Sequence, residues 1–121
     1  MPFRVLLPEN YDPSKKYPLV LFLHGRGESG VDNEKQLTHG AKMFLQDSIR
    51  KNYPAIVVFP QCASNSYWSN VQAVITGSKT GKRTFYFVSD GEPSQSMKML
   101  MGLVRNLLVR YPIKTNQVYV M

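Results

Sequence analysis

The chain has 121 residues, enough for at most one domain, and its hydrophobic content of 43% excludes a disordered chain. Lysine and arginine total 15 against 8 acidic residues, which gives a net charge of +7. The basic residues are spread from Arg4 to Lys114 and form no run of five, so the charge does not predict a nucleic-acid partner. A basic nucleic-acid-binding module stays open as a minor alternative.

The cysteine and histidine content limits the kinds of site that the chain can hold. Cys62 is the single cysteine, so no internal disulfide can form. With His24 and His39 as the only histidines, we expect no structural zinc site, and no organic cofactor is implied. We find no signal peptide and no apolar run long enough for a membrane span, and the compartment (bacterial cytoplasm, periplasm or exterior) stays open.

The first half of the chain predicts three strands and one helix. Residues 3–7 form a short apolar stretch that ends at Pro8 and predicts a strand. Residues 19–23 (LVLFL) predict a central strand that is buried on both faces, as in a parallel sheet. Apolar residues at helical spacing predict a helix over 37–49, with Gly40 as its weak point, and residues 55–59 predict a second buried strand.

The second half predicts a hairpin, a helix and a last strand. Residues 71–75 and 84–88 read as two strands joined by a polar turn that ends at Arg83. From Met97 onwards the spacing is that of an amphipathic helix, with Ser94 as its N-cap and its end near Tyr111, before Pro112. Residues 117–120 (QVYV) predict a third buried strand. Strands that alternate with helices predict an α/β fold with a mostly parallel sheet, flanking helices and a hairpin insertion.

The segment from His24 to Gly27 (HGRG) directly follows the predicted central strand. Gly25 and Gly27 allow a sharp turn that brings a backbone N–H close to a ligand. A donor in such a loop stabilises the oxyanion that develops during acyl transfer. We expect the Arg26 N–H to be this donor and His24 to hold the loop, since a histidine in this place is more often structural than catalytic.

Several segments together resemble a known family. They are PLVLFLHGRGESGVDN, QLTHGAK, YPAIVVFPQC with SYW, EPSQSMKMLMGLV and RYPIKTNQVYV. They resemble the N-terminal half of α/β-hydrolases of the bacterial phospholipase/carboxylesterase group, which is close to polyhydroxybutyrate depolymerase-like and prolyl-oligopeptidase-like serine esterases. The likeness covers nearly the whole chain and is weakest between Asn70 and Gly91.

The resemblance implies a serine hydrolase that cleaves small-molecule or polymer esters. It places Gln61 and Trp68 near the wall of a substrate site and gives Glu28 a part in bracing the loop. Arg26 stands where the family usually has a small residue. In the family a G-x-S-x-G nucleophile elbow follows the strand that QVYV resembles, and the Asp and His come later. Residues 1–121 are therefore expected to be one partial domain that ends before the nucleophile and is inactive alone.

A second interpretation stays open. The chain acts in binding or self-association, without catalysis, through the exposed edge of an incomplete sheet.

Overall fold

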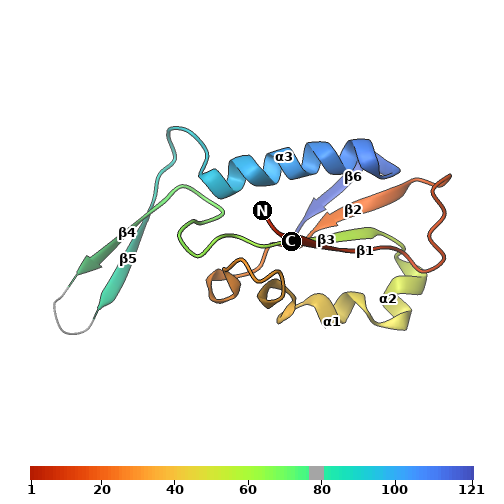
Figure 1. Ribbon diagram of the computed structural model, residues 1–121, viewed down its shortest axis with the longest axis horizontal. Helices are drawn as coiled ribbons and strands as arrows, with labels where there is room; N and C mark the ends of the chain where they lie inside the picture. Colours follow the sequence, from red (N-terminus) through yellow and green to blue (C-terminus); the bar gives the residue numbers. More distant parts are fainter. Residues whose placement is uncertain (77–80) are drawn as a thin grey trace.

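A computed structural model describes residues 1–76 and 81–121. Its main sheet has four strands in the order β1-β3-β2-β6, with bounds Phe3–Leu6, Ile56–Pro60, Tyr17–Leu21 and Ile113–Val120. β1 runs antiparallel to β3, whereas β3 and β6 both run parallel to β2. The predicted α/β architecture with a mostly parallel sheet is confirmed. Figure 1 shows helices on both faces of this sheet.

Helix α3 (Gln95–Arg110) covers one face of the sheet, and both of its predicted ends are confirmed. The Ser94 hydroxyl accepts a hydrogen bond from the Met97 N–H at 3.1 Å, which satisfies one of the unpaired donors of the first turn. Tyr111 takes an extended conformation before Pro112 and ends the helix. The helix contributes Leu107 to the larger buried cluster, beside Leu19 and Ile56 of the sheet.

The opposite face is covered by short elements instead of the single helix predicted over residues 37–49. These elements are the 3₁₀ turns η1 (Arg26–Glu28) and η2 (Lys35–Leu37) and the helices α1 (Ala41–Phe44) and α2 (Asp47–Asn52). The helical prediction was wrong at Gly40, which has φ +83°. A Cβ atom there would lie 2.2 Å from the Phe22 ring, so close packing between the sheet and this segment forces a break.

The predicted hairpin is confirmed as β4 (Val71–Thr76) and β5 (Lys82–Phe87), which form a separate two-stranded sheet. It projects away from the body of the molecule in Figure 1. The predicted polar turn falls partly on residues 77–80, which lie outside the described residues.

The last strand differs from the prediction of a buried strand. β6 starts at Ile113 and is exposed over most of its length, including Tyr119. Among the described residues it pairs only with β2, so one of its edges has no neighbouring strand. An apolar sequence therefore occupies the edge of the sheet here.

Candidate functional site at the carboxyl end of β2

The carboxyl end of β2 is the point where the sheet changes winding direction. From β2 the chain passes through α1 and α2 to β3 on one side, and α3 then leads to β6 on the other side. The two connections lie on opposite faces of the sheet (Figure 1). In open α/β sheets, ligands bind in the crevice at such a point, outside the carboxyl ends of the strands. The loop that starts at His24 occupies this place.

His24 is 5% exposed, and both of its ring nitrogens are engaged. The Cys62 N–H donates to His24 Nε2 at 2.9 Å, so Nε2 carries no proton. Nδ1, which lies 2.6 Å from the Gly25 carbonyl oxygen, is then the protonated nitrogen and donates to it. This arrangement ties the loop to the end of β3 and leaves His24 no free nitrogen for proton transfer.

The turn η1 presents a backbone donor at its first residue. Gly25 precedes it with φ −76° and ψ 177°, and the Glu28 N–H donates to the Gly25 carbonyl oxygen. The first N–H groups of a helical turn have no partner within the turn. Within residues 1–76 and 81–121, no group accepts a hydrogen bond from the Arg26 N–H. Gly27 borders open space, since nothing lies within 4 Å of a Cβ atom built on it.

The Arg26 side chain fastens this turn to the loop that follows β3. Its guanidinium donates to the carbonyl oxygens of Ser64 and Ser66, the latter at 3.1 Å. It also lies over the Tyr67 ring, 4.6 Å from the ring centroid, in a cation–π contact. The residue that carries the candidate donor is therefore held through its own side chain.

Gln61 has a position other than the substrate wall that the resemblance implied. Its side chain is fully buried, and its carbonyl oxygen accepts the Asn33 N–H at 2.7 Å. Its amide nitrogen donates to the Glu28 carbonyl oxygen and to Asp32 Oδ1. From its buried position, Gln61 thus holds the loop in place through hydrogen bonds to Glu28, Asp32 and Asn33. The role implied for Glu28 agrees in part, because its backbone takes part in this brace.

Asp32 completes the brace and was not anticipated from the sequence. Backbone N–H groups of Lys35 and Glu34 and the Gln61 amide donate to its carboxylate and hold its pKa well below the ordinary value. Since Asp32 stays ionised, its carboxylate remains a negatively charged hydrogen-bond acceptor over the whole neutral pH range. An acidic residue three positions before the first residue of a 3₁₀ turn is a weak signal, and only the contact with Gln61 links Asp32 to the loop.

A pocket of about 290 Å³ opens beside the loop. Trp68 lines it, and its indole N–H donates to the His24 carbonyl oxygen at 3.0 Å. The place of Trp68 in a substrate site stays a prediction. Arg26 of the predicted loop also lines it. The sequence analysis missed Tyr67, Val71, Phe85 and Phe87, because these wall residues are far from the loop in the chain.

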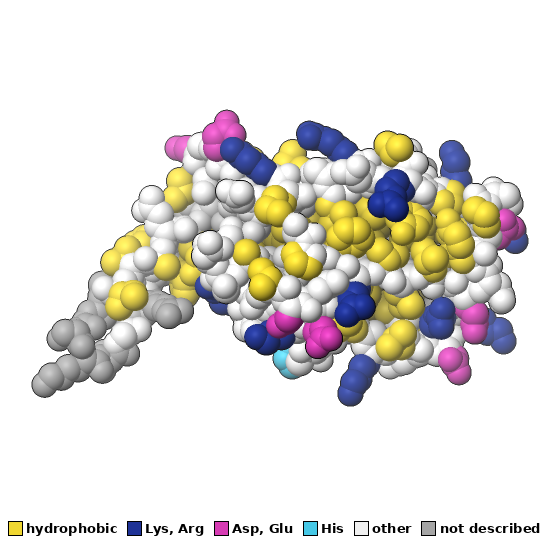
Figure 2. Space-filling view, viewed as in Figure 1, with side chains coloured by type: hydrophobic (Ala, Val, Ile, Leu, Met, Phe, Trp, Pro, Cys, Tyr) yellow, Lys and Arg dark blue, Asp and Glu magenta, His cyan; other side chains and the backbone are white. Residues whose placement is uncertain are grey.

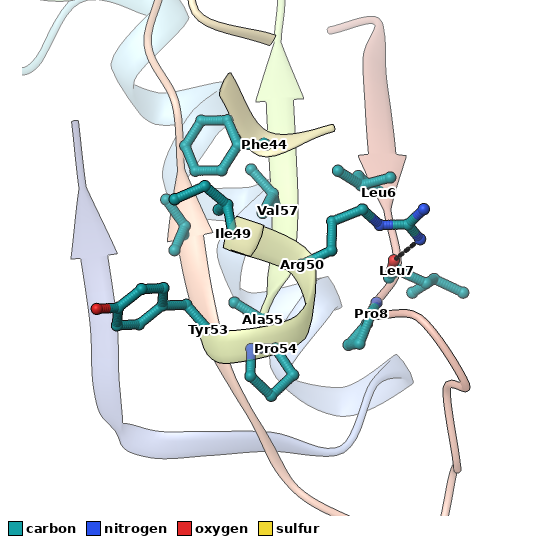
Figure 3. A pocket seen from close by; sticks show the side chains of 11 residues that line it. Leu6, Leu7, Pro8, Phe44, Ile49, Arg50, Tyr53, Pro54, Ala55 and Val57 are labelled. Atoms are coloured by element: carbon teal, nitrogen blue, oxygen red, sulfur yellow. Dashed lines mark hydrogen bonds between the residues drawn. The ribbon is translucent and has the colours of Figure 1, made fainter. Parts of the chain in front are cut away.

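A smaller hollow of about 100 Å³ lies between α2 and the strands β1 and β3 (Figure 3). Arg50 extends across it and donates to the Leu7 carbonyl oxygen at 3.3 Å. Ala55 precedes the first residue of β3, so this hollow lies at the end of the strand opposite to the loop site. It is mostly apolar, and no group suited to catalysis lines it.

The described ranges, 1–76 and 81–121, contain neither a metal-binding cluster nor a membrane-spanning helix. These residues hold no group of three or more His, Cys, Asp or Glu side chains that could bind a metal ion. Their helices are too short or too polar to cross a bilayer.

Comparisons with known proteins show that the chain is similar to esterases. The family model described as "Putative esterase" matches residues 1–86. A solved structure described as "Crystal Structure of a Thermostable Esterase" superposes with a TM-score of 0.74 at 32% sequence identity. The match covers 98% of this chain and 29% of the thermostable esterase, so the chain spans less than a third of that protein's length. No curated protein matches the chain.

Proposed function

Since the chain belongs to the esterase family of that model, we propose that it forms the oxyanion-binding side of a serine esterase active site. The Arg26 N–H is the donor, and Gly25 and Gly27 give the loop its shape. The observation that carries this proposal is the unpaired Arg26 N–H, at the winding switch of the sheet and beside a pocket. A donor aimed at the developing oxyanion contributes about 3–4 kcal/mol to transition-state stabilisation.

The nucleophile of the proposed reaction belongs to a segment beyond Met121. The end of β6 lies next to the loop, because the Leu23 N–H donates to the Met121 carbonyl oxygen at 2.7 Å. A serine on a turn after β6 would therefore stand close to the Arg26 N–H. A histidine from the same segment would shuttle the proton, and an acid would orient that histidine and stabilise its charged form. The reaction is the hydrolysis of a carboxylic ester.

Two substitutions at position 26 separate the backbone donor from the side chain. Arg26→Pro removes the N–H, and the turn tolerates it, because proline suits the first position of a helical turn and Gly25 is already extended. Arg26→Ala keeps the N–H and loses only the guanidinium contacts. In an esterase that contains this segment and the nucleophile, we expect Arg26→Pro to lower kcat about 10²–10³-fold more than Arg26→Ala does.

The expected effect is on kcat, with little change in KM, because the interaction forms only in the transition state. Equal kcat values for the two variants would contradict the role of the Arg26 N–H.

A second measurement tests the position of the nucleophile. The 121-residue chain alone should neither react with a fluorophosphonate probe nor hydrolyse p-nitrophenyl acetate, and stoichiometric labelling of the pure chain would overturn that part of the proposal.

A further inference from the structure

The hairpin β4–β5 has an apolar face that continues the pocket wall. Cross-strand pairing sets Val71 opposite Phe87 and Ala73 opposite Phe85. Paired residues of an antiparallel ribbon point to the same face, and so does every second residue along a strand. Ile75 therefore extends the same face, over about 13 Å from Val71. Val71, Phe85 and Phe87 already line the pocket at its inner end.

The part of this face formed by Val71, Ala73, Ile75, Phe85 and Phe87 is apolar and largely open to solvent. Phe85 is 44% exposed, Ile75 is 66% exposed and Phe87 is 77% exposed. Figure 2 shows hydrophobic side chains along the projecting hairpin. A hairpin of two strands is only marginally stable in water, and contiguous exposed apolar groups on it indicate a surface that binds something.

The contacts at the inner end of the hairpin indicate what that occupant is. The Phe85 ring packs edge-on against the Tyr67 ring at a centroid distance of 6.2 Å, and the Arg26 guanidinium lies over the same Tyr67 ring. The apolar face is therefore connected, through Tyr67, to the residue that is the proposed oxyanion donor. The pocket of about 290 Å³ lies at the small end of the range for ligand sites. An ester with a longer apolar group would fill it and continue along the hairpin.

We infer that the hairpin face of Ala73, Ile75, Phe85 and Phe87 binds the extended apolar group of the ester, from the pocket wall outward along the hairpin. This inference rests on the proposed function, because that function makes an ester the occupant. The hairpin then selects substrates by length: esters with long aliphatic groups gain contacts that acetate-sized esters cannot reach. Phe87 is a specificity-determining residue and takes no part in the chemical step.

The single tryptophan provides the readout for a binding test. Trp68 lines the pocket, so its fluorescence reports occupancy in the 121-residue chain without any catalysis. We expect methyl octanoate to bind the chain more tightly than methyl acetate. Phe87→Ala should weaken methyl octanoate binding about tenfold, as expected for loss of much of a phenyl contact, and weaken methyl acetate binding much less. Phe87→Leu should restore most of the affinity.

Tyr86→Ala is the matched control, since Tyr86 neighbours Phe87 but pairs with Gln72 on the other face and is 56% exposed. It should leave methyl octanoate binding unchanged. Equal losses in Phe87→Ala and Tyr86→Ala, with unchanged thermal melts, would overturn the inference. So would a Phe87-dependent binding to phosphatidylcholine vesicles, or a Phe87-dependent dimer in sedimentation, in the absence of any preference for the longer ester.

The two proposals fail separately. Failure of the proposed function appears as equal kcat in Arg26→Pro and Arg26→Ala, which leaves the fluorescence titration untouched. Failure of the present inference appears as a Phe87→Ala variant that binds methyl octanoate like the parent chain, even where Arg26→Pro has its expected effect on kcat.

Discussion

Gly40 shows how one residue can decide the course of the chain around the site. Its φ of +83° is a conformation that side chains other than glycine rarely adopt, and the Phe22 ring fills the space where a Cβ atom would stand. Phe22 itself packs against Phe44 and Phe59 in an aromatic cluster. The backbone conformation and the close packing therefore both require glycine at position 40.

We expect Gly40→Ala to lower the free energy of unfolding by at least about 1–3 kcal/mol, through backbone strain and displacement of the Phe22 ring. Gly102→Ala is the control. Gly102 lies inside α3 with nothing within 4 Å of an added Cβ atom, so this change should stabilise the chain by about 0.5–1 kcal/mol. Urea denaturation measures both, and a Gly40→Ala chain as stable as the parent would contradict the steric argument.

At the scale of elements, Ser94 connects α3 to the loop that forms part of the pocket wall. The Ser94 hydroxyl accepts the Met97 N–H and also donates to the Tyr67 carbonyl oxygen at 2.8 Å. The N-terminus of the helix is thereby linked to the loop that carries the aromatic wall. One side chain thus stabilises the helix and positions the loop.

Ser94→Ala should cost about 1 kcal/mol of stability, because the first turn of α3 loses its capping acceptor. Ser94→Thr keeps both the acceptor and the donor and should stay within a few tenths of a kcal/mol of the parent. Thermal melts followed by circular dichroism compare the two variants. The argument fails if Ser94→Thr is destabilised as much as Ser94→Ala is.

For the whole molecule, the exposed edge of β6 is the feature with the widest consequence. Tyr119 is 52% exposed and Val120 is 62% exposed, and within residues 1–76 and 81–121 no strand covers the outer side of β6. Unpaired edge strands are templates for pairing with a further strand. The interpretation that the chain acts in binding or self-association stays a prediction, and the association state of the isolated chain tests it.

We expect the isolated 121-residue chain to self-associate at micromolar concentrations, and Tyr119→Lys to shift it to monomer, because a charge on an edge strand opposes pairing. Val109→Lys removes an even more exposed apolar residue, on α3, and should leave the association unchanged. Sedimentation velocity over a range of concentrations measures both. A parent chain that is monomeric throughout would show that the edge is not used for pairing.

The sequence by itself determined the elements whose signals are local. The apolar run before His24 predicted the central strand, the Ser94 cap and Pro112 predicted both ends of α3, and the glycines around Arg26 predicted a sharp turn. These signals depend on residues within a few positions of one another, so hydrophobic periodicity and capping chemistry suffice to detect them. The order of strands and helices, and with it the α/β class, followed from the same signals.

Only the tertiary structure decided which segments meet. Phe22 breaks the predicted helix at Gly40, and Gln61 braces a loop some thirty residues earlier in the chain. The Phe87 side chain joins a pocket that begins at His24. Likewise, β6 is exposed because it lies at the edge of the sheet, although its last four residues, QVYV, predicted a buried strand. Contacts of this kind depend on packing between distant segments, and no local pattern of residue types specifies them.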